Sequence, residues 1–148
     1  MNVIVANPNS LAFEDQLNQI IKITKLMTKE IGYVMPIVLR EQASRGNLLL
    51  LMSGNLVMGF CNYNIRKKDG VGVIYEVGTH PAIRGKGGGK QLVEAVLTKC
   101  EKIHLKCPID NKSNGFYSRI GEKIGVEQGK KRPLNLWQIT NKTVKEES

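Results

Sequence analysis

The spacing of hydrophobic residues changes along the chain, and each change predicts a new element. A short apolar run at Asn2–Ala6 predicts a strand. Apolar residues then recur three or four positions apart across Phe13–Ile31, the spacing of an amphipathic helix. Ser10 is the expected N-cap of this helix and Gly32 its stop. A second, shorter helix is predicted over Pro36–Ala43.

The middle of the chain has the character of extended strands. Two apolar stretches, Asn47–Met52 and Leu56–Asn64, flank the tripeptide Ser-Gly-Asn, which is typical of a hairpin turn. A polar turn at 66–70 leads to a third stretch, Val71–Thr79, rich in valine and isoleucine. We therefore predict three successive antiparallel strands.

The second half alternates helix and strand. One predicted helix places its apolar residues on a single face: Leu92, Val93, Val96, Leu97 and Cys100. A strand at Lys102–Ile109, a short helix ending at Gly121 and a hairpin turning at Gly129–Pro133 follow. The predicted fold class is α/β (α+β): one domain over residues 1–140 with a mixed, mostly antiparallel sheet flanked by helices. Residues 141–148 are expected to form a polar, frayed tail.

Composition limits the classes of function. The 148 residues include 22 Lys and Arg against 13 Asp and Glu, a formal net charge of +9 that attracts anionic partners. Only 5% of residues are aromatic, which leaves little stacking surface for single-stranded nucleic acid. No apolar run has the length of a membrane span, and no secretory signal is visible at the N-terminus. We expect a cytoplasmic protein without a membrane partner.

The cysteine and histidine residues do not indicate a metal site. Cys61, Cys100 and Cys107 match no zinc or redox spacing, and His80 and His104 are not spaced with them as ligands. An odd number of cysteines also argues against a framework of disulfides. Reduced thiols, and no metal, are therefore expected.

The segment "THPAIRGKGGGKQLVEAVL" combines glycine, positive charge and the start of a helix. It is not a P-loop, because Arg84 stands where the first glycine is required and Gln91 where a hydroxyl is required. It is not a dinucleotide fingerprint either, because Lys90 or Leu92 occupies the last glycine position. A third pattern, R-x-x-G-x-G, fits directly after a predicted strand and before a predicted helix.

This third pattern resembles the acetyl-CoA loop of the GNAT superfamily of N-acetyltransferases. The resemblance implies a GNAT-type fold in which a splayed pair of strands holds the coenzyme, with the later strand near Leu105–Cys107 on the other side. Glycines let backbone N–H groups approach a pyrophosphate, and a helix N-terminus adds its own donors. The bland interpretation, which stays open, is a flexible basic loop that binds nothing.

The resemblance also implies the residues that hold acetyl-CoA. Main-chain groups of the strand would bind the pantetheine arm and the loop would bind the phosphates. The implied cofactor-binding residues are Val77, Gly78, Thr79, Arg84, Gly85, Lys86, Gly87, Gly88, Gly89, Lys90 and Asn114. Acetyl-CoA would act as a co-substrate, without a metal.

Two catalytic residues follow from the resemblance. In "NKSNGFYSRIG", Tyr117 matches the family tyrosine that protonates the departing thiolate. Glu76, on the strand before the loop, is the candidate general base, although the sequence does not tell which face of the strand it takes. His80 matches a structural corner and is a weaker candidate. Glu122 departs from the family pattern, which has phenylalanine there.

The resulting hypothesis is an acetyl-CoA-dependent N-acetyltransferase that transfers acetyl directly to a primary amine in a ternary complex. The alternatives are a non-catalytic acyl-CoA-binding domain and, less favoured, a small basic nucleic-acid-binding protein. Segments 27–45 and 125–133 are expected to form the acceptor groove. The acceptor is not identified by the sequence, and a homodimer is possible.

Overall fold

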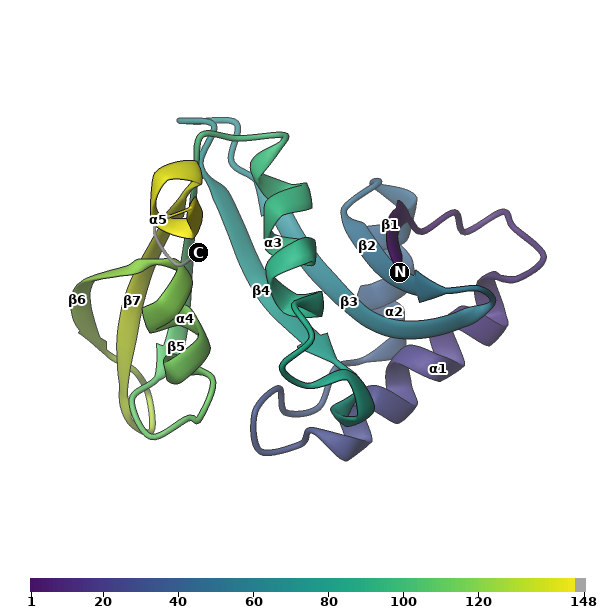
Figure 1. Cartoon of the computed structure of the whole chain (residues 1–148), viewed down its shortest axis with the longest axis horizontal. Helices are drawn as coiled ribbons and strands as arrows, with labels where there is room; N and C mark the ends of the chain where they lie inside the picture. Colours follow the sequence, from purple (N-terminus) through teal and green to yellow (C-terminus); the bar gives the residue numbers. More distant parts are fainter. Residues whose placement is uncertain (146–148) are drawn as a thin grey trace. The chain divides into compact units, whose positions relative to one another are not determined.

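The computed structural model describes residues 1–145, and its elements follow the predicted order with one short helix added at the end (Figure 1). The elements are β1 (Asn2–Val5), α1 (Phe13–Leu26), α2 (Pro36–Ser44), β2 (Leu48–Ser53), β3 (Leu56–Ile65), β4 (Gly72–Thr79), the 3-10 turn η1 (Pro81–Ile83), α3 (Gly88–Leu97), β5 (Lys102–Pro108), α4 (Asn114–Ile120), β6 (Glu122–Gln128), β7 (Pro133–Thr140) and α5 (Asn141–Lys145). Across this part of the chain, no helix combines the length and the apolar character needed to cross a bilayer.

The strands form a seven-stranded sheet in the order β1-β2-β3-β4-β5-β7-β6. The pairs β1–β2, β2–β3, β5–β7 and β6–β7 are antiparallel, whereas β4 pairs with β5 in parallel. A parallel pair requires a crossover connection, and α3 supplies it. The mixed, mostly antiparallel fold class predicted from the sequence is confirmed.

The chain divides into two compact units. The first contains Met1–Tyr63 and Glu76–Val93, and the second contains Asn64–Tyr75 and the described part of Glu94–Ser148.

In the first unit, β2 is buried on both faces. Leu48 and Leu50 pack on one face in a core that contains residues of α1 and α2. Leu51 points to the opposite face, where its Cδ2 atom approaches the first residue of α3. Figure 1 shows the same arrangement, with α1 and α2 on one side of these strands and α3 on the other. A strand covered on both faces needs a continuous apolar run, which explains the sequence "LLLLM".

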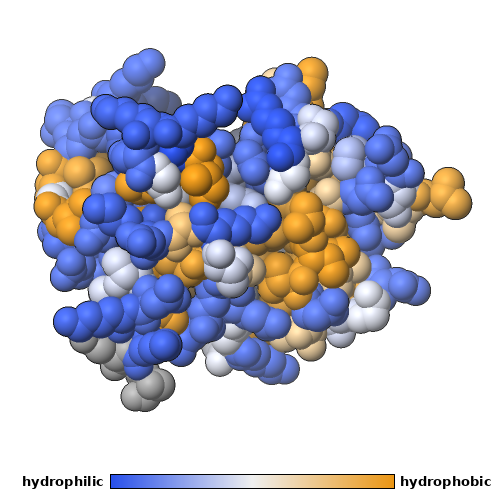
Figure 2. Space-filling model, turned by 90° about the horizontal axis from the view of Figure 1, so that it is seen from above, coloured by the Kyte–Doolittle hydropathy of each residue, from blue (hydrophilic) through white to orange (hydrophobic). Residues whose placement is uncertain are grey.

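In the second unit, β5 and β7 bury alternate residues on one face. The register pairs Ile103 with Ile139 and Leu105 with Trp137, so these four side chains share that face. Tyr117 of α4 packs against Trp137, which places α4 over the same face. The edge strand β6 is largely exposed, and hydrophobic residues reach the surface at the left margin of Figure 2, on the side of β6.

The first long helix is shorter than predicted. It begins at Phe13, and Ser10 does not cap its first turn, because the Ser10 hydroxyl accepts a hydrogen bond from Ala12 N–H instead. It ends at Leu26, since Met27 has left the helical conformation with φ −126° and ψ 35°. Ile31 still contacts the core, but from a turn rather than from a helix.

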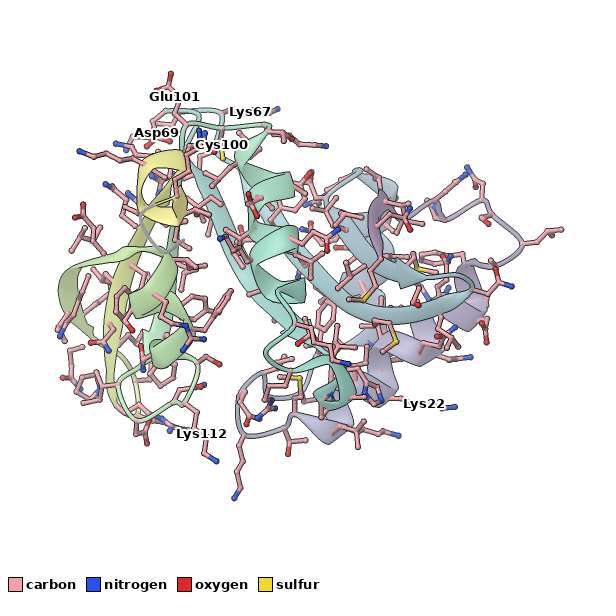
Figure 3. The ribbon with its side chains drawn as sticks, viewed as in Figure 1. Lys22, Lys67, Asp69, Cys100, Glu101 and Lys112 are labelled. Carbon is pink, nitrogen blue, oxygen red and sulfur yellow. The ribbon has the colours of Figure 1, made fainter. Side chains whose placement is uncertain are left out.

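The prediction for Cys100 was also wrong, since α3 ends at Leu97 and Cys100 lies in the connection to β5. Its Sγ atom lies only 2.8 Å from the position that a Cβ atom on Gly72 would take. Figure 3 labels Cys100 and Asp69 at the same end of the second unit. Cys100 therefore packs against the start of β4 instead of extending the apolar face of α3.

The expected frayed tail is helical over Asn141–Lys145. Thr140 and Thr143 exchange hydrogen bonds, and the Thr143 hydroxyl donates to Ile120 O at 2.8 Å. Val144 is buried. These contacts give the segment an anchor on the second unit, while residues 146–148 lie outside the described residues.

Candidate functional site

The glycine segment begins with a tight corner and continues in a conformation that side chains disfavour. After η1, Gly85 and Gly87 have φ angles of +81° and +82°, and nothing lies within 4 Å of the position of a Cβ atom at either residue. The need for glycine at these two positions is therefore conformational rather than steric. This conformational requirement adds to the expectation from the sequence that glycines let backbone N–H groups approach a pyrophosphate.

The same segment forms the N-terminus of α3. The helix begins at Gly88, inside the glycine run, and Gln91 N–H makes an early helical bond to Gly87 O at 3.0 Å. The N–H groups of Gly88 and Gly89 lie in the first turn, where helix geometry provides no acceptor within the helix. Arg84 and Lys86 are exposed beside them. Donors and positive charge together suit a polyanion such as the diphosphate of coenzyme A.

Gly88 has a different reason to be glycine. A Cβ atom there would lie 2.8 Å from Leu51 Cδ2 and 3.0 Å from Ile83 Cδ1. The first turn of α3 therefore packs directly on β2. This contact fixes the direction in which the helix N-terminus points within the first unit.

His80 supports the corner rather than chemistry. The backbone N–H of His80 donates to Met58 O at 2.7 Å, and the imidazole Nδ1 of His80 accepts from Ala82 N–H at 3.0 Å. The imidazole therefore caps η1. This arrangement agrees with the weaker standing of His80 as a base.

Glu76 lies on the same face of β4 as Gly78, since strand residues alternate. Its Oε1 accepts a hydrogen bond from Asn62 Nδ2 of β3 at 3.1 Å. Burial raises the pKa of the Glu76 carboxyl, and the hydrogen bond from Asn62 partly opposes this by lowering it. A raised pKa suits a group that must take up a proton near neutral pH.

The strand segment Val77–Thr79 is closely packed on its Gly78 face. A Cβ atom on Gly78 would lie 2.3 Å from Ile31 Cδ1. On the neighbouring strand, a Cβ atom on Gly59 would lie 2.9 Å from Gly78 O. The two glycines allow β3, β4 and the connection after α1 to approach one another next to Glu76.

Tyr117 lies in the second unit, on α4. Its side chain is buried, and its ring packs against Phe116 and Trp137, with centroids 5.4 and 6.4 Å away. Two aromatic neighbours restrict the rotamer of Tyr117. Its role as an acid stays a prediction.

The side-chain amide of Asn114, also in the second unit, makes four hydrogen bonds. Its Nδ2 donates to Pro108 O and Asn111 O, and its Oδ1 accepts from Asn135 Nδ2 and Trp137 Nε1. These bonds use both donors and both lone pairs of the side-chain amide. Asn114 thus anchors the start of α4 to β5 and β7, and its contact with a cofactor stays a prediction.

The departure at Glu122 is accommodated at the surface. Gly121 is held against β7, because a Cβ atom there would lie 2.8 Å from Gln138 O. Glu122 follows as the exposed first residue of β6 and pairs with Gln138. The phenylalanine of the family pattern is therefore replaced by a side chain that faces solvent.

The structure brings one part of the predicted site together in the first unit: Glu76, Val77–Thr79 and the segment 84–90. Asn114 and Tyr117 belong to the second unit. Sequence reasoning missed Asn62 and Gln42, which lead to Glu76 through one buried and one partly buried hydrogen bond. The available signal was an asparagine within the apolar strand "LVMGFCNYN".

A comparison with protein families identifies the chain. The model of the acetyltransferase (GNAT) family matches residues 17–121. The chain belongs to the GNAT family of acetyltransferases. The match spans both the glycine segment and Tyr117, and it confirms the resemblance derived from the sequence. No curated protein matches this GNAT chain by sequence.

Solved structures share the fold. A GNAT-family acetyltransferase from Bacillus cereus has 18% identity and a TM-score of 0.72, covering 94% of this chain and 96% of that one. An aminoglycoside 6'-N-acetyltransferase complexed with coenzyme A has 12% identity and a TM-score of 0.76, covering 95% and 97%. An acetyltransferase from Salmonella typhimurium that modifies the N-terminal serine of a 50S ribosomal subunit protein has 17% identity and a TM-score of 0.71, covering 93% of each chain.

Proposed function

We propose that this GNAT protein transfers an acetyl group from acetyl-CoA to a primary amine, by direct attack in a ternary complex within a single domain that extends past the expected boundary at residue 140 to include α5. The observation that carries the proposal is the glycine segment. Two glycines in left-handed conformations follow β4 and the turn η1 and lead into a helix N-terminus. The coenzyme supplies the activated acetyl thioester.

The binding residues divide by what each can offer. Gly85, Gly87, Gly88 and Gly89 offer backbone N–H groups to the diphosphate, and Arg84, Lys86 and Lys90 add positive charge. Main-chain groups of Val77, Gly78 and Thr79 would bind the pantetheine arm as an added strand. Asn114 supports this binding through the anchored start of α4.

The catalytic roles follow from proton balance. The acceptor ammonium must lose a proton before its nitrogen attacks the thioester carbon, and the Glu76 carboxylate takes that proton. As the carbon–sulfur bond breaks, the Tyr117 hydroxyl protonates the departing thiolate, and the nitrogen loses its second proton to solvent, which leaves a neutral amide. Each turnover moves one acetyl group and returns both residues to their starting states after exchange with solvent.

The acceptor and the assembly state belong to the same proposal. Two acetyltransferases with a similar fold act on an aminoglycoside and on a protein N-terminus, respectively. We propose an acceptor with a free primary amine and a homodimer formed through the exposed edge strand β6 in the cytoplasm.

The test has two arms. Thermal unfolding with and without acetyl-CoA should show stabilisation of about 2.7 kcal/mol at a hundredfold excess over Kd. Release of free thiol should then be measured with an aminoglycoside, a polyamine, a peptide with a free N-terminus and a lysine peptide. Stabilisation without thiol release would indicate the non-catalytic acyl-CoA-binding domain. No stabilisation, combined with salt-dependent retention on nucleic acid, would favour the nucleic-acid-binding alternative.

A further inference from the structure

A chain of hydrogen-bonded amides leads through the first unit to Glu76. Gln42 Nε2 of α2 donates to Tyr63 O at 2.8 Å and to Asn62 Oδ1 at 2.6 Å. Asn62 Nδ2 then donates to Glu76 Oε1 at 3.1 Å. Gln42 is 7% exposed and Asn62 only 2%, so both amides are buried in an otherwise apolar core.

The direction of this chain is fixed by its first member. A backbone carbonyl can only accept a hydrogen bond, so Gln42 must present its NH₂ group to Tyr63 O. The same NH₂ group lies against Asn62, which must therefore present its oxygen to Gln42. The Asn62 NH₂ group is then left for Glu76. Each amide is oriented by the one before it, and the carboxylate receives a donor.

We propose that Asn62 and Gln42 are positioning residues for the base Glu76, holding its Oε1 atom so that its Oε2 atom receives the proton of the acceptor amine. This inference rests on the proposed function, because it assigns a purpose to Glu76 in acetyl transfer. Burying two amides costs free energy unless their hydrogen bonds are made. Gln42 also satisfies the buried carbonyl of Tyr63, so the part of the chain that serves Glu76 alone is the hydrogen bond from Asn62.

The elements packed around Glu76 carry other titratable and charged groups. Asn62 is its neutral donor, and Cys61, also on β3, is a neighbouring thiol whose pKa is raised by burial and then by the charge of Glu76. On α2 the charged residues are Arg40, which pairs with Glu14, and Glu41, and both are exposed. The connection that carries Ile31 has Lys29, which is exposed, and Glu30, which is partly buried.

The decisive variant is Asn62→Asp. It matches asparagine in size and can still accept the hydrogen bond from Gln42, but it cannot donate to Glu76 when ionised and it adds a like charge. Asn62→Leu removes the donor without adding charge. Both variants should raise the pKa of Glu76, since each removes a hydrogen bond that favours the carboxylate.

The measurement is the pH profile of kcat/KM, on whichever panel amine the wild-type chain acetylates fastest. Its acid limb should move to higher pH in both variants, lowering kcat/KM on that limb about tenfold. Gln42→Met should shift the limb in the same direction by less, because Asn62 keeps its donor but loses its fixed orientation. Carbon-13 NMR of the Glu76 carboxyl should show the same shift in the protein without substrate.

Val57→Ala is the control, because Val57 is buried on the same strand away from this chain of amides. It should lower stability and leave both titrations unchanged. Variants at Asn62 that lose stability while the acid limb and the NMR titration stay in place would overturn the inference. If instead Glu76→Gln keeps full turnover while the Asn62 variants still shift the NMR titration of Glu76, then Glu76 is not the base. In that case the proposed catalytic role fails and the hydrogen-bond assignment stands.

Discussion

At the residue scale, the carboxyl group of Glu76 is subject to two opposed effects. Burial raises its pKa above the ordinary value of 4.5, and the hydrogen bond from Asn62 lowers it. Because burial is the larger effect, the folded protein favours the protonated form more than the unfolded chain does. The contribution of Glu76 to the free energy of unfolding is therefore fully present below the unfolded pKa and declines as pH rises through the folded pKa.

This sign gives a prediction that does not depend on catalysis. Glu76→Gln resembles the protonated side chain, so it should stabilise the protein more at pH 7 than at pH 4, relative to the wild type. Urea unfolding at the two pH values measures the difference. Glu94→Gln, which removes one carboxylate from the exposed face of α3, is the control for the change in net charge. A difference of the opposite sign would mean that the hydrogen bond outweighs burial.

Tyr117 gives a second prediction at this scale. Tyr117→Phe keeps the ring and its packing against Trp137 while removing the hydroxyl. Turnover should fall about 100-fold or more, the usual contribution of a positioned acid, with acetyl-CoA affinity retained. Isothermal titration and thiol release measure the two quantities separately. Phe116→Leu, which alters the neighbouring ring, should affect stability more than turnover. Unchanged turnover in Tyr117→Phe would remove the assigned role.

At the element scale, the glycine segment and the start of α3 act as one structure. Gly87→Ala forces a side chain into φ +82°, at a cost of about 1–2 kcal/mol. Because relaxation of this strain moves the N–H groups at the helix N-terminus, Kd for acetyl-CoA should rise about tenfold or more. Gly54→Ala is a matched control, since Gly54 has φ +58° in an open hairpin of the same unit.

Both glycine variants should lose similar stability, but only Gly87→Ala should lose affinity. Equal affinity in the two proteins would show that strain at the loop does not reach the binding groups. Titration calorimetry combined with thermal unfolding measures both quantities.

The elements could be predicted where the hydrophobic residues of each had a regular spacing or were separated by a clear turn signal. The helical spacing after Phe13 and the hairpin around Ser-Gly-Asn lead directly to α1, β2 and β3. The sequence could not predict α5, because "NKTVK" has one apolar residue and depends on a hydrogen bond from Thr143 to distant Ile120. The face taken by Glu76 was also hidden. Apolar residues precede and follow it on both faces of β4, so alternation gives no answer.

At the scale of the whole molecule, β6 is one of the two edge strands of the sheet, with β1 at the other edge, and it is the strand that we propose for assembly. It ends the strand order of the sheet, and Ile124 and Val126 are 48% and 56% exposed. Antiparallel pairing of two β6 strands about Gly125 would place Ile124 against Val126 of the second copy. The same register would bring Lys123 close to Glu127 of the second copy, beside the Lys106 that already pairs with Glu127 at 2.7 Å within that copy, and the β-bulge between Lys123 and Gly125 would lie at the axis.

We therefore predict that Lys123→Glu weakens the proposed homodimer, because it opposes two carboxylates at both symmetric positions. Analytical ultracentrifugation should show that the wild type is a dimer. The variant should dissociate at a higher protein concentration than the wild type does. Lys130→Glu makes the same change in charge at an exposed residue outside β6 and should leave the dimer intact. A wild-type monomer at about 100 μM, where even a weak edge pairing with Kd near 10 μM is mostly formed, would exclude assembly through β6. Equal weakening by both substitutions would instead assign the effect to net charge, because only Lys123 lies in the register that pairs with Glu127.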